Sequence, residues 1–155
     1  MQWSEVLETP YLQNLPFKIE LNKFGQILMS PASNRHGNIQ VEIGALLVRK
    51  LPKGKTFSEC SIQTRDGVRV ADVAWASAEF LSRHGDVTPF PQAPELCVEI
   101  VSPSNTKAEI DYKVSLYFAQ GAQEVWVVSL QKKVTIYVGG LPAAKSKYLP
   151  KFKAL

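Results

Sequence analysis

Cysteine is scarce in this sequence, and long apolar runs and leader-like segments are absent. The two cysteines, Cys60 and Cys97, are too few for a disulfide framework or a zinc site built on cysteine pairs. No segment approaches the roughly 20 apolar residues that a membrane span needs. The first ten residues contain Glu5 and Glu8 and no basic residue, which is unlike a secretory signal. These absences predict a cytoplasmic protein with reduced thiols and no membrane partner.

Several catalytic motifs are also missing. The sequence has no Gly-rich phosphate loop, no Gly-x-Ser-x-Gly elbow and no His-Glu-x-x-His pair. The pattern therefore gives no support for a nucleotide-triphosphatase loop, a serine-hydrolase elbow or a zinc-protease helix. Any chemistry has to come from less conspicuous residues.

Acidic residues are absent after Glu124, and this absence divides the chain by charge. The residues beyond it contain six lysines, a charge of +6, whereas the first 124 contain 12 basic and 14 acidic residues, a charge of −2. A basic tail on a mildly acidic body is compatible with an anionic partner such as nucleic acid. A solvated, solubilising tail is the more ordinary explanation of such a run.

Length and composition are those of one globular domain. Of the 155 residues, 45% are apolar and 21% charged, which argues against a disordered chain. A chain of this length buries roughly 70% of its extended surface on folding. We find no repeat and no internal boundary. We therefore expect a single domain over residues 1–155, with a lead-in at 1–16 and a basic tail at 139–155.

Hydrophobic periodicity predicts an α/β (α+β) fold. Alternation and apolar runs predict strands at residues 17–21, 26–29, 56–63, 69–75, 96–101, 125–128 and 134–138. Helical spacing predicts helices at residues 34–51 and 106–120, with one or two further turns at 77–83. This order of elements favours a mixed β-sheet with a helix packed on each side.

Two acids lie in the middle of otherwise apolar strands. Asp72 follows Val70-Ala71, and Glu99 lies between Val98 and Ile100. A lone carboxylate is costly to bury unless it is paired, protonated or bound to a cation. If the two strands are neighbours in matching register, the carboxylates converge and suit a hard cation such as Mg²⁺. Two unrelated acids at strand ends are the alternative.

Lys113 is the third candidate, because its position is unusual for a charged residue. On a helical wheel it falls between Leu116 and Tyr117, inside the apolar arc of its helix. A lysine there must extend to solvent or meet an acid. The turn after Glu99 is short, so the ammonium is expected within reach of Glu99 or of a bound phosphate. A lysine at the boundary of the core is the alternative.

A set of local motifs gives the chain a family resemblance. The segment from Pro94 to Thr106, then Asp111-Tyr112-Lys113, Tyr117, Gly121 and Val125 to Val128, resembles the signature of the Uma-two family of putative restriction endonucleases, a family assigned to the PD-(D/E)XK nuclease superfamily. Weaker matches extend the resemblance over about residues 17–138. The resemblance implies a restriction-endonuclease-like mixed sheet flanked by helices on both sides.

The resemblance also implies a metal-dependent site. Asp72 and Glu99 match the two acids of the superfamily motif, and the backbone carbonyl of Ile100 would be a further ligand of Mg²⁺ or Mn²⁺. Val101 stands where the superfamily has its catalytic lysine. An apolar residue is common there in this family, and Lys113 on the next helix is the natural substitute. The implied catalytic set is Asp72, Glu99 and Lys113.

Four further residues are possible accessory groups. Glu20 alternates with apolar neighbours, which favours a solvent-facing side chain over a further acid at the site. His36, in the first turn of its helix, would cap and pack rather than contact phosphate. Glu42 would be either a helical acid of the site or a partner in a salt bridge on the helix flank. Asp111 would orient Lys113 or face solvent.

These observations lead to one hypothesis and two alternatives. The leading hypothesis is a Mg²⁺-dependent endonuclease that hydrolyses phosphodiester bonds, with DNA as the expected partner and a homodimer as a possible assembly. The first alternative is a catalytically inactive nuclease-fold module that binds nucleic acid or a protein, which the missing lysine at Val101 favours. The second is a structural protein in which the buried acids form an internal salt-bridge cluster with Lys113.

Overall fold

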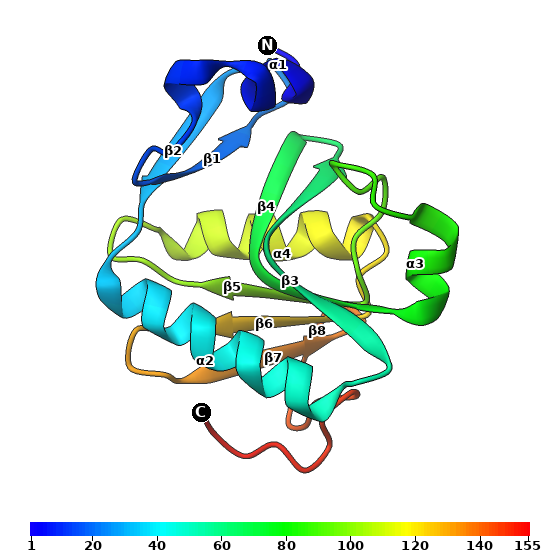
Figure 1. The fold of residues 1–155 in the computed structure, drawn as a ribbon. Helices are drawn as coiled ribbons and strands as arrows, with labels where there is room; N and C mark the ends of the chain where they lie inside the picture. Colours follow the sequence, from blue (N-terminus) through cyan, green and yellow to red (C-terminus); the bar gives the residue numbers. More distant parts are fainter.

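The computed structural model describes residues 1–155 and contains a six-stranded sheet, a separate two-stranded hairpin and four α-helices (Figure 1). The helices are α1 (Trp3–Glu8), α2 (Asn34–Lys50), α3 (Ala78–His84) and α4 (Lys107–Ala119), with a 3₁₀ turn at Pro10–Leu12. The strands are β1 (Phe17–Leu21), β2 (Ile27–Pro31), β3 (Gly54–Thr64), β4 (Gly67–Ser77), β5 (Leu96–Ile100), β6 (Glu124–Val128), β7 (Val134–Val138) and β8 (Leu141–Ala143).

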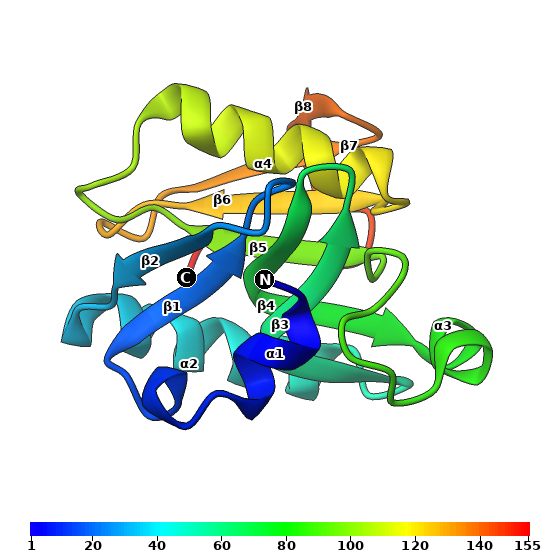
Figure 2. The same ribbon diagram turned by 90° about the horizontal axis from the view of Figure 1, so that it is seen from above.

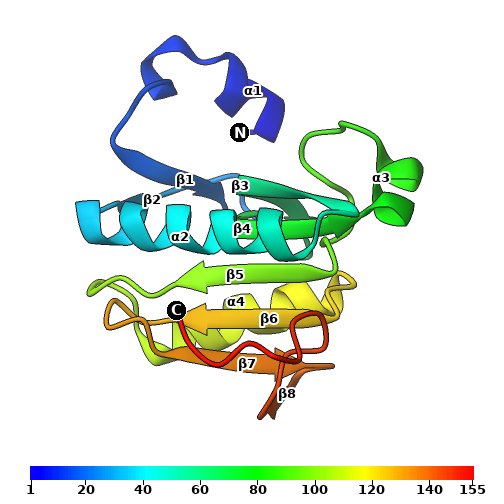
Figure 3. The same cartoon turned by 60° about the horizontal axis from the view of Figure 1, so that its bottom comes forward.

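The large sheet has the strand order β3-β4-β5-β6-β7-β8. Strands β5 and β6 are parallel and are connected through α4, whereas every other neighbouring pair is antiparallel. Helix α2 lies on one face of this sheet and α4 on the other (Figures 1 and 3). The predicted mixed sheet flanked by helices on both sides is therefore confirmed. None of the helices combines the length and the apolar character that a membrane crossing requires.

Alternation along β5 divides the core between the two faces of the sheet. Leu96, Val98 and Ile100 belong to the apolar cluster that α2 covers, whereas Cys97 belongs to the cluster that α4 covers. Because side chains alternate along a strand, Glu99 points to the same face as Cys97, toward α4. The Glu99 carboxylate on a strand within the sheet therefore faces helix α4.

Both long helices begin at side-chain caps that the sequence provides. Ser33 accepts a hydrogen bond from the backbone N–H of His36 at the start of α2. Thr106 and Glu109 form a reciprocal capping box at the start of α4. Such caps satisfy backbone donors that have no partner within the helix. The cap of α2 also fixes the first turn of that helix, from which His36 reaches the site.

The tight β3–β4 turn is where the hairpin meets the sheet. Gly67 has a φ of +81°, and a Cβ there would lie 2.3 Å from the backbone oxygen of Leu21 in β1. Asp66 in the same turn accepts a hydrogen bond from the backbone N–H of Lys23. Glycine at this position therefore allows β1 to approach β4 closely.

The strand that contains Glu20 lies outside the main sheet, because β1 and β2 pair only with each other and lie beside β4 (Figures 1 and 2). One expectation, about the C-terminal end of the domain, needs correction. The basic tail is not a free solvated segment. Its lysines at 145, 147, 151 and 153 are exposed. The segment runs on the same side of the sheet as α2 (Figure 3), and apolar side chains between the lysines pack in the cluster that α2 covers.

Aromatic contacts hold this C-terminal segment in place. The ring of Phe152 stacks on Trp126 at a centroid distance of 4.7 Å, and Tyr148 lies 5.2 Å from the ring of Trp75. Leu149 between them is buried. Charge counting identified the lysines correctly but overlooked the apolar residues that alternate with them.

Candidate active site

The two strand carboxylates converge. Strands β4 and β5 pair at Val73 and Val98, so Asp72 and Glu99 occupy the next position along each strand. Both side chains are buried, with relative exposures of 1% for Asp72 and 3% for Glu99. Asp72 Oδ2 accepts a hydrogen bond of 2.6 Å from the backbone N–H of Ile100. This bond ties the two strands together where their ladder ends, as the neighbouring-strand prediction required.

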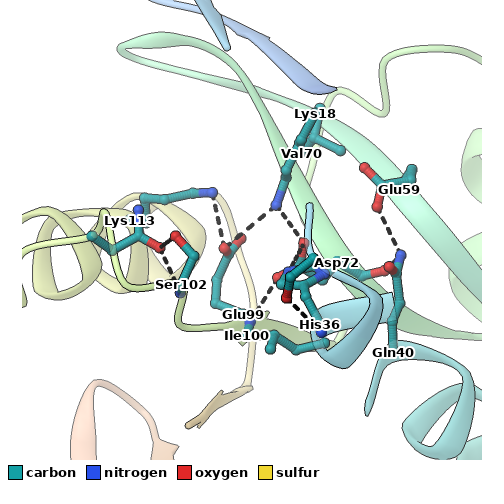
Figure 4. Close-up of polar contacts among 12 residues, drawn as sticks. Lys18, His36, Gln40, Glu59, Val70, Asp72, Glu99, Ile100, Ser102 and Lys113 are labelled. Carbon is teal, nitrogen blue, oxygen red and sulfur yellow. Dashed lines mark hydrogen bonds and ion pairs between the residues drawn. The ribbon is translucent and has the colours of Figure 1, made fainter. Parts of the chain in front are cut away.

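Lys18 joins the two carboxylates, and sequence reasoning missed it. Its Nζ lies 2.7 Å from Asp72 Oδ1 and 3.5 Å from Glu99 Oε2 (Figure 4). The side chain is 11% exposed and reaches the site from β1. Strand alternation places Lys18 on the same face as Glu20. That shared polar face was the available signal, but nothing in the sequence indicated that the face would be covered.

Lys113 enters the site from α4, as its position in the apolar arc predicted. Its Nζ lies 2.9 Å from Glu99 Oε2 and 2.9 Å from Glu20 Oε1. The expected solvent-facing Glu20 is a wrong prediction, because this residue is buried and also accepts a 2.7 Å hydrogen bond from the backbone N–H of Val70. Arg69 lies 3.8 Å from its other oxygen. Glu20 therefore links the hairpin, β4 and α4.

Helix α2 contacts Asp72 from the opposite side. His36 Nε2 lies 3.4 Å from Asp72 Oδ1, and the ring is buried rather than only capping the helix. Gln40, one turn later, donates hydrogen bonds to the backbone oxygen of Asp72 and to Glu59 Oε1. Glu59 stands at a bulge in β3 with a φ of +50°. These contacts fix the backbone and the side chain of Asp72 together.

Tyr117 is a second residue of the cluster that the sequence did not reveal as functional. Its hydroxyl donates a hydrogen bond to Glu99 Oε1, and its ring is fully buried. It lies four residues after Lys113, so both side chains share one face of α4. Tyr117 and Lys113 therefore each hold one of the two oxygens of Glu99.

The charges in the cluster shift one another's protonation. Burial alone would raise the pKa of Asp72, but Lys18 and the hydrogen bond from His36 hold it well below its usual value. Burial raises the pKa of Glu99 despite the opposing effects of Lys113 and Lys18. Burial would likewise raise the pKa of Glu20, but Lys113 and Lys18 lower it. The two central carboxylates thus differ, and Asp72 is the more firmly ionised.

The cationic and phenolic groups are shifted as well. Burial alone would lower the pKa of Lys18, but attraction to Glu99, Asp72 and Glu20 outweighs burial and raises it above the usual value. Burial, with the charge of Glu99, raises the pKa of the Tyr117 hydroxyl well above its usual value. Tyr117 is therefore a hydrogen-bond donor to Glu99 at neutral pH, and Lys18 is a full positive charge.

Two of the predicted accessory residues lie elsewhere. Glu42 forms a salt bridge with Lys132 at 2.7 Å on the flank of α2. Asp111 pairs with Lys107 at the exposed side of α4, so it does not orient Lys113. Ile100 contacts the cluster through its backbone N–H, and the ligand role of its carbonyl stays a prediction. Of the accessory set, His36 and Glu20 are thus the ones that join the cluster.

The cluster forms the floor of a cleft of about 810 Å³. Hairpin residues form one wall and the start of α4 with its preceding loop forms the other. The lining includes Phe17, Leu28, Met29, Ser102, Ser104, Asn105 and Tyr112. Buried charges at the end of an accessible cleft are a common arrangement in catalytic and ligand-binding sites.

The donor set suits a hard divalent cation. Asp72 Oδ1 and Glu99 Oε2 both lie within 3.5 Å of a single nitrogen, Lys18 Nζ, so they already face one shared cation from two strands. Carboxylate oxygens in such pairs are typical ligands of Mg²⁺, which keeps several waters and needs few protein ligands. No group of three or more His, Cys, Asp and Glu side chains is arranged to hold a metal ion. The fit is therefore to an ion held by two carboxylates.

Comparison with known proteins agrees with this geometry. The model of the Uma2 family, described as "Putative restriction endonuclease", matches residues 3–151. The chain belongs to this family. A search of curated proteins finds no match. The resemblance inferred from the Pro94–Thr106 block and the residues after it is therefore confirmed.

The solved structure of another protein shares the fold of this Uma2 chain. It is described as a putative nuclease belonging to DUF820 from Anabaena variabilis ATCC 29413. The two proteins align with a TM-score of 0.71 and 18% sequence identity, over 100% of this chain and 83% of the other. The alignment covers the hairpin and the C-terminal segment as well as the sheet. The Uma2 chain therefore has a nuclease-like fold throughout.

Proposed function

We propose that this Uma2 protein is an endonuclease that hydrolyses phosphodiester bonds in DNA with the help of Mg²⁺ or Mn²⁺. The observation that supports this most directly is the convergence of Asp72 and Glu99 on one point at the floor of a cleft. Membership of the restriction endonuclease family supports the same reaction class.

Asp72, Glu99 and the backbone carbonyl of Ile100 would hold the metal ion in this proposal. The chemistry supplied by a divalent cation there is polarisation of a phosphate oxygen and activation of water. Tyr117 and the backbone N–H of Ile100 orient the two carboxylates, because each donates to an oxygen that does not face Lys18. His36 adds a further contact on Asp72.

Lys113 replaces the catalytic lysine that the superfamily motif has at the position of Val101. Its ammonium reaches Glu99 from α4, and Glu20 holds it on the other side at the same distance of 2.9 Å. A fixed positive charge beside the scissile phosphate stabilises the negative charge that develops during hydrolysis. Glu20 thus becomes a positioning residue for Lys113. A lysine from a helix can do this work as well as a lysine from a strand, because only the position of the ammonium matters.

The proposal also includes a cell compartment and an oligomeric state. The two buried free thiols, Cys60 and Cys97, suit a reducing compartment such as the cytoplasm. Cutting both strands of DNA would need two sites, which a homodimer would supply.

The alternative function, a catalytically inactive module that binds nucleic acid or protein, is favoured by one observation. Lys18 and Lys113 already neutralise much of the charge of the acids.

A plasmid-nicking assay in Mg²⁺ or Mn²⁺ tests the proposal. We expect wild type to nick supercoiled DNA, and Asp72→Asn and Glu99→Gln to lower the rate at least about a hundred-fold. Lys113→Met should lower it about tenfold or more. Asp111→Asn is the matched control, because it makes the same change on the exposed side of α4, and we expect its rate within about threefold of wild type.

The alternatives give different results in the same experiment. Wild-type activity at the level of the variants, together with salt-sensitive DNA binding, would establish the inactive binding module instead. If the protein neither cleaves nor binds DNA, the acids and lysines are a structural ion-pair cluster.

A further inference from the structure

We propose that Lys18 is a tethered cation that competes with the divalent metal ion for the point between Asp72 and Glu99, and that Lys18 must withdraw into the cleft for the metal to bind. This inference rests on the proposed function, because it concerns the same site. It assigns a specific task to a residue outside the sequence motifs of the family resemblance.

Geometry distinguishes Lys18 from the other lysine of the site. Lys18 Nζ contacts both carboxylates proposed to hold the metal, Asp72 at 2.7 Å and Glu99 at 3.5 Å. The ion pairs of Lys113 are with Glu99 and Glu20. Figure 4 shows Lys18 between the two carboxylates, with Lys113 on the far side of Glu99. An ammonium and a metal ion cannot both occupy the space that Lys18 fills.

Charge balance points the same way. The carboxylates of Asp72, Glu99, Glu20 and Asp66 give four negative charges, and Lys18, Lys113 and Arg69 give three positive ones. A divalent ion added to this set would leave one uncompensated positive charge in a buried site, which is costly. If Lys18 withdraws, the divalent ion alone restores neutrality. The metal ion would therefore bind in exchange for Lys18.

The attachment of Lys18 makes withdrawal feasible. β1 belongs to the two-stranded hairpin outside the main sheet, and the hairpin packs on a small core of Val6, Leu21 and Val68. The two main cores contain 14 and 12 buried residues. Lys18 also lines the cleft, so its flexible side chain can move toward solvent without disturbing β4 or β5. Lys113 also lines the cleft, but it pairs with Glu20 as well as Glu99 and does not contact Asp72 at ion-pair distance.

Mn²⁺ binding to the whole protein, measured by calorimetry or electron paramagnetic resonance without DNA, tests the competition. We expect Lys18→Met and Lys18→Gln to bind Mn²⁺ at least about tenfold more tightly than wild type, because each removes the positive charge that pairs with both carboxylates. Lys23→Met is the matched control, since Lys23 is exposed at the tip of the same hairpin, and its affinity should equal that of wild type.

The outcomes separate this inference from the proposed function. Equal or weaker Mn²⁺ binding by both Lys18 variants, with measurable binding by wild type, would overturn the competition and leave the metal site intact. No Mn²⁺ binding by any of the proteins would overturn both. Lys18→Gln retains a hydrogen-bond donor toward Asp72, so it offers a second folded protein if Lys18→Met is unstable.

Chemical labelling tests the same idea without any substitution. We expect Mn²⁺ to raise the rate of acetylation of Lys18 several-fold in wild type, measured by mass spectrometry, with Lys23 as an unchanged internal reference. Unchanged labelling of Lys18 at saturating Mn²⁺ would show that its ammonium stays between the carboxylates, and would overturn the proposal.

Discussion

Glu124 and the Asp72–Glu99 pair are both buried acids of the same sheet, but different groups satisfy them. Glu124, with no exposure, accepts hydrogen bonds from the indole of Trp126, the hydroxyl of Ser146 and the backbone N–H of Lys147. All three donors are uncharged groups. Asp72 and Glu99 are satisfied chiefly by the ammonium groups of lysines from other elements.

This difference separates an acid enclosed within the fold from two acids at the floor of a cleft. The donors to Glu124 come from its own strand and from the C-terminal segment, so its hydrogen bonds attach that segment to β6. The partners of Asp72 and Glu99 lie at the floor of a cleft, and under the proposed function a metal ion and a phosphate would replace them. A buried acid among neutral donors therefore indicates an anchor, whereas a buried acid among cations at a cleft indicates a site.

The largest expected effect is on catalysis. Glu99→Gln should lower the rate of DNA nicking at least about a hundred-fold, because it removes a charge that the metal needs. Glu124→Gln should leave the rate per folded molecule within about threefold of wild type. Nicking rates normalised to the folded fraction, measured by circular dichroism, check both. Equal losses in the two variants would break the comparison.

The next largest effect is on stability, and it is expected at Glu124. Glu124→Ala should lower the free energy of unfolding by about 3 kcal/mol, because three donors, two of them buried, lose their acceptor. The exposed Glu79, paired with Arg83, is the control, and Glu79→Ala should cost no more than about 0.5 kcal/mol. Urea unfolding measures both. A cost below about 1 kcal/mol for Glu124→Ala would mean that this acid is not an anchor.

A smaller effect is expected where the C-terminal segment closes over the sheet. Phe152→Ala should lower the free energy of unfolding by about 2 kcal/mol, since its ring stacks on Trp126. Lys153→Ala, one residue later and exposed, should change it by less than about 0.5 kcal/mol. Nicking by both variants should stay at the wild-type rate. A selective loss of nicking in Phe152→Ala would show that the anchor region and the site are coupled.

The smallest effect concerns pH. The hydrogen bond to Asp72 raises the pKa of His36 above its usual value, with burial and Lys18 opposing and Glu59 assisting. A raised folded-state pKa stabilises the fold below the unfolded-state value of about 6.5 and loses this contribution as pH rises through the folded-state value. The stability difference between wild type and His36→Gln should therefore shrink from pH 6 to pH 8. A difference that grows over this range would contradict the contact.

The central part of the site was predictable because its residues violate local patterns. Asp72 and Glu99 interrupt apolar strands, and Lys113 interrupts the apolar arc of a helix. Each violation has a physical cost that a partner must offset. The partners were predictable for Glu99 and Lys113, because one short turn separates their elements.

Lys18 and Glu20 were not predictable in the same way. Alternation in β1 correctly separated a polar face from an apolar one, but both faces are covered. Ile19 packs toward the small core near α1, while the polar face meets the site. Lys18 lies 54 residues from Asp72 in the sequence. Only tertiary packing of the hairpin against β4 determines that contact, and local periodicity contains no information about it.

The cover over Trp75 and Trp126 has a consequence for biosynthesis. Tyr148 and Phe152 follow in the chain every strand and helix whose face they cover. On the ribosome, the sheet face next to α2 can therefore form while two tryptophans are still bare. A nascent chain at that stage presents an aromatic patch to chaperones and to other nascent chains. Emergence of Tyr148 and Phe152 from the exit tunnel would then be the event that removes this patch.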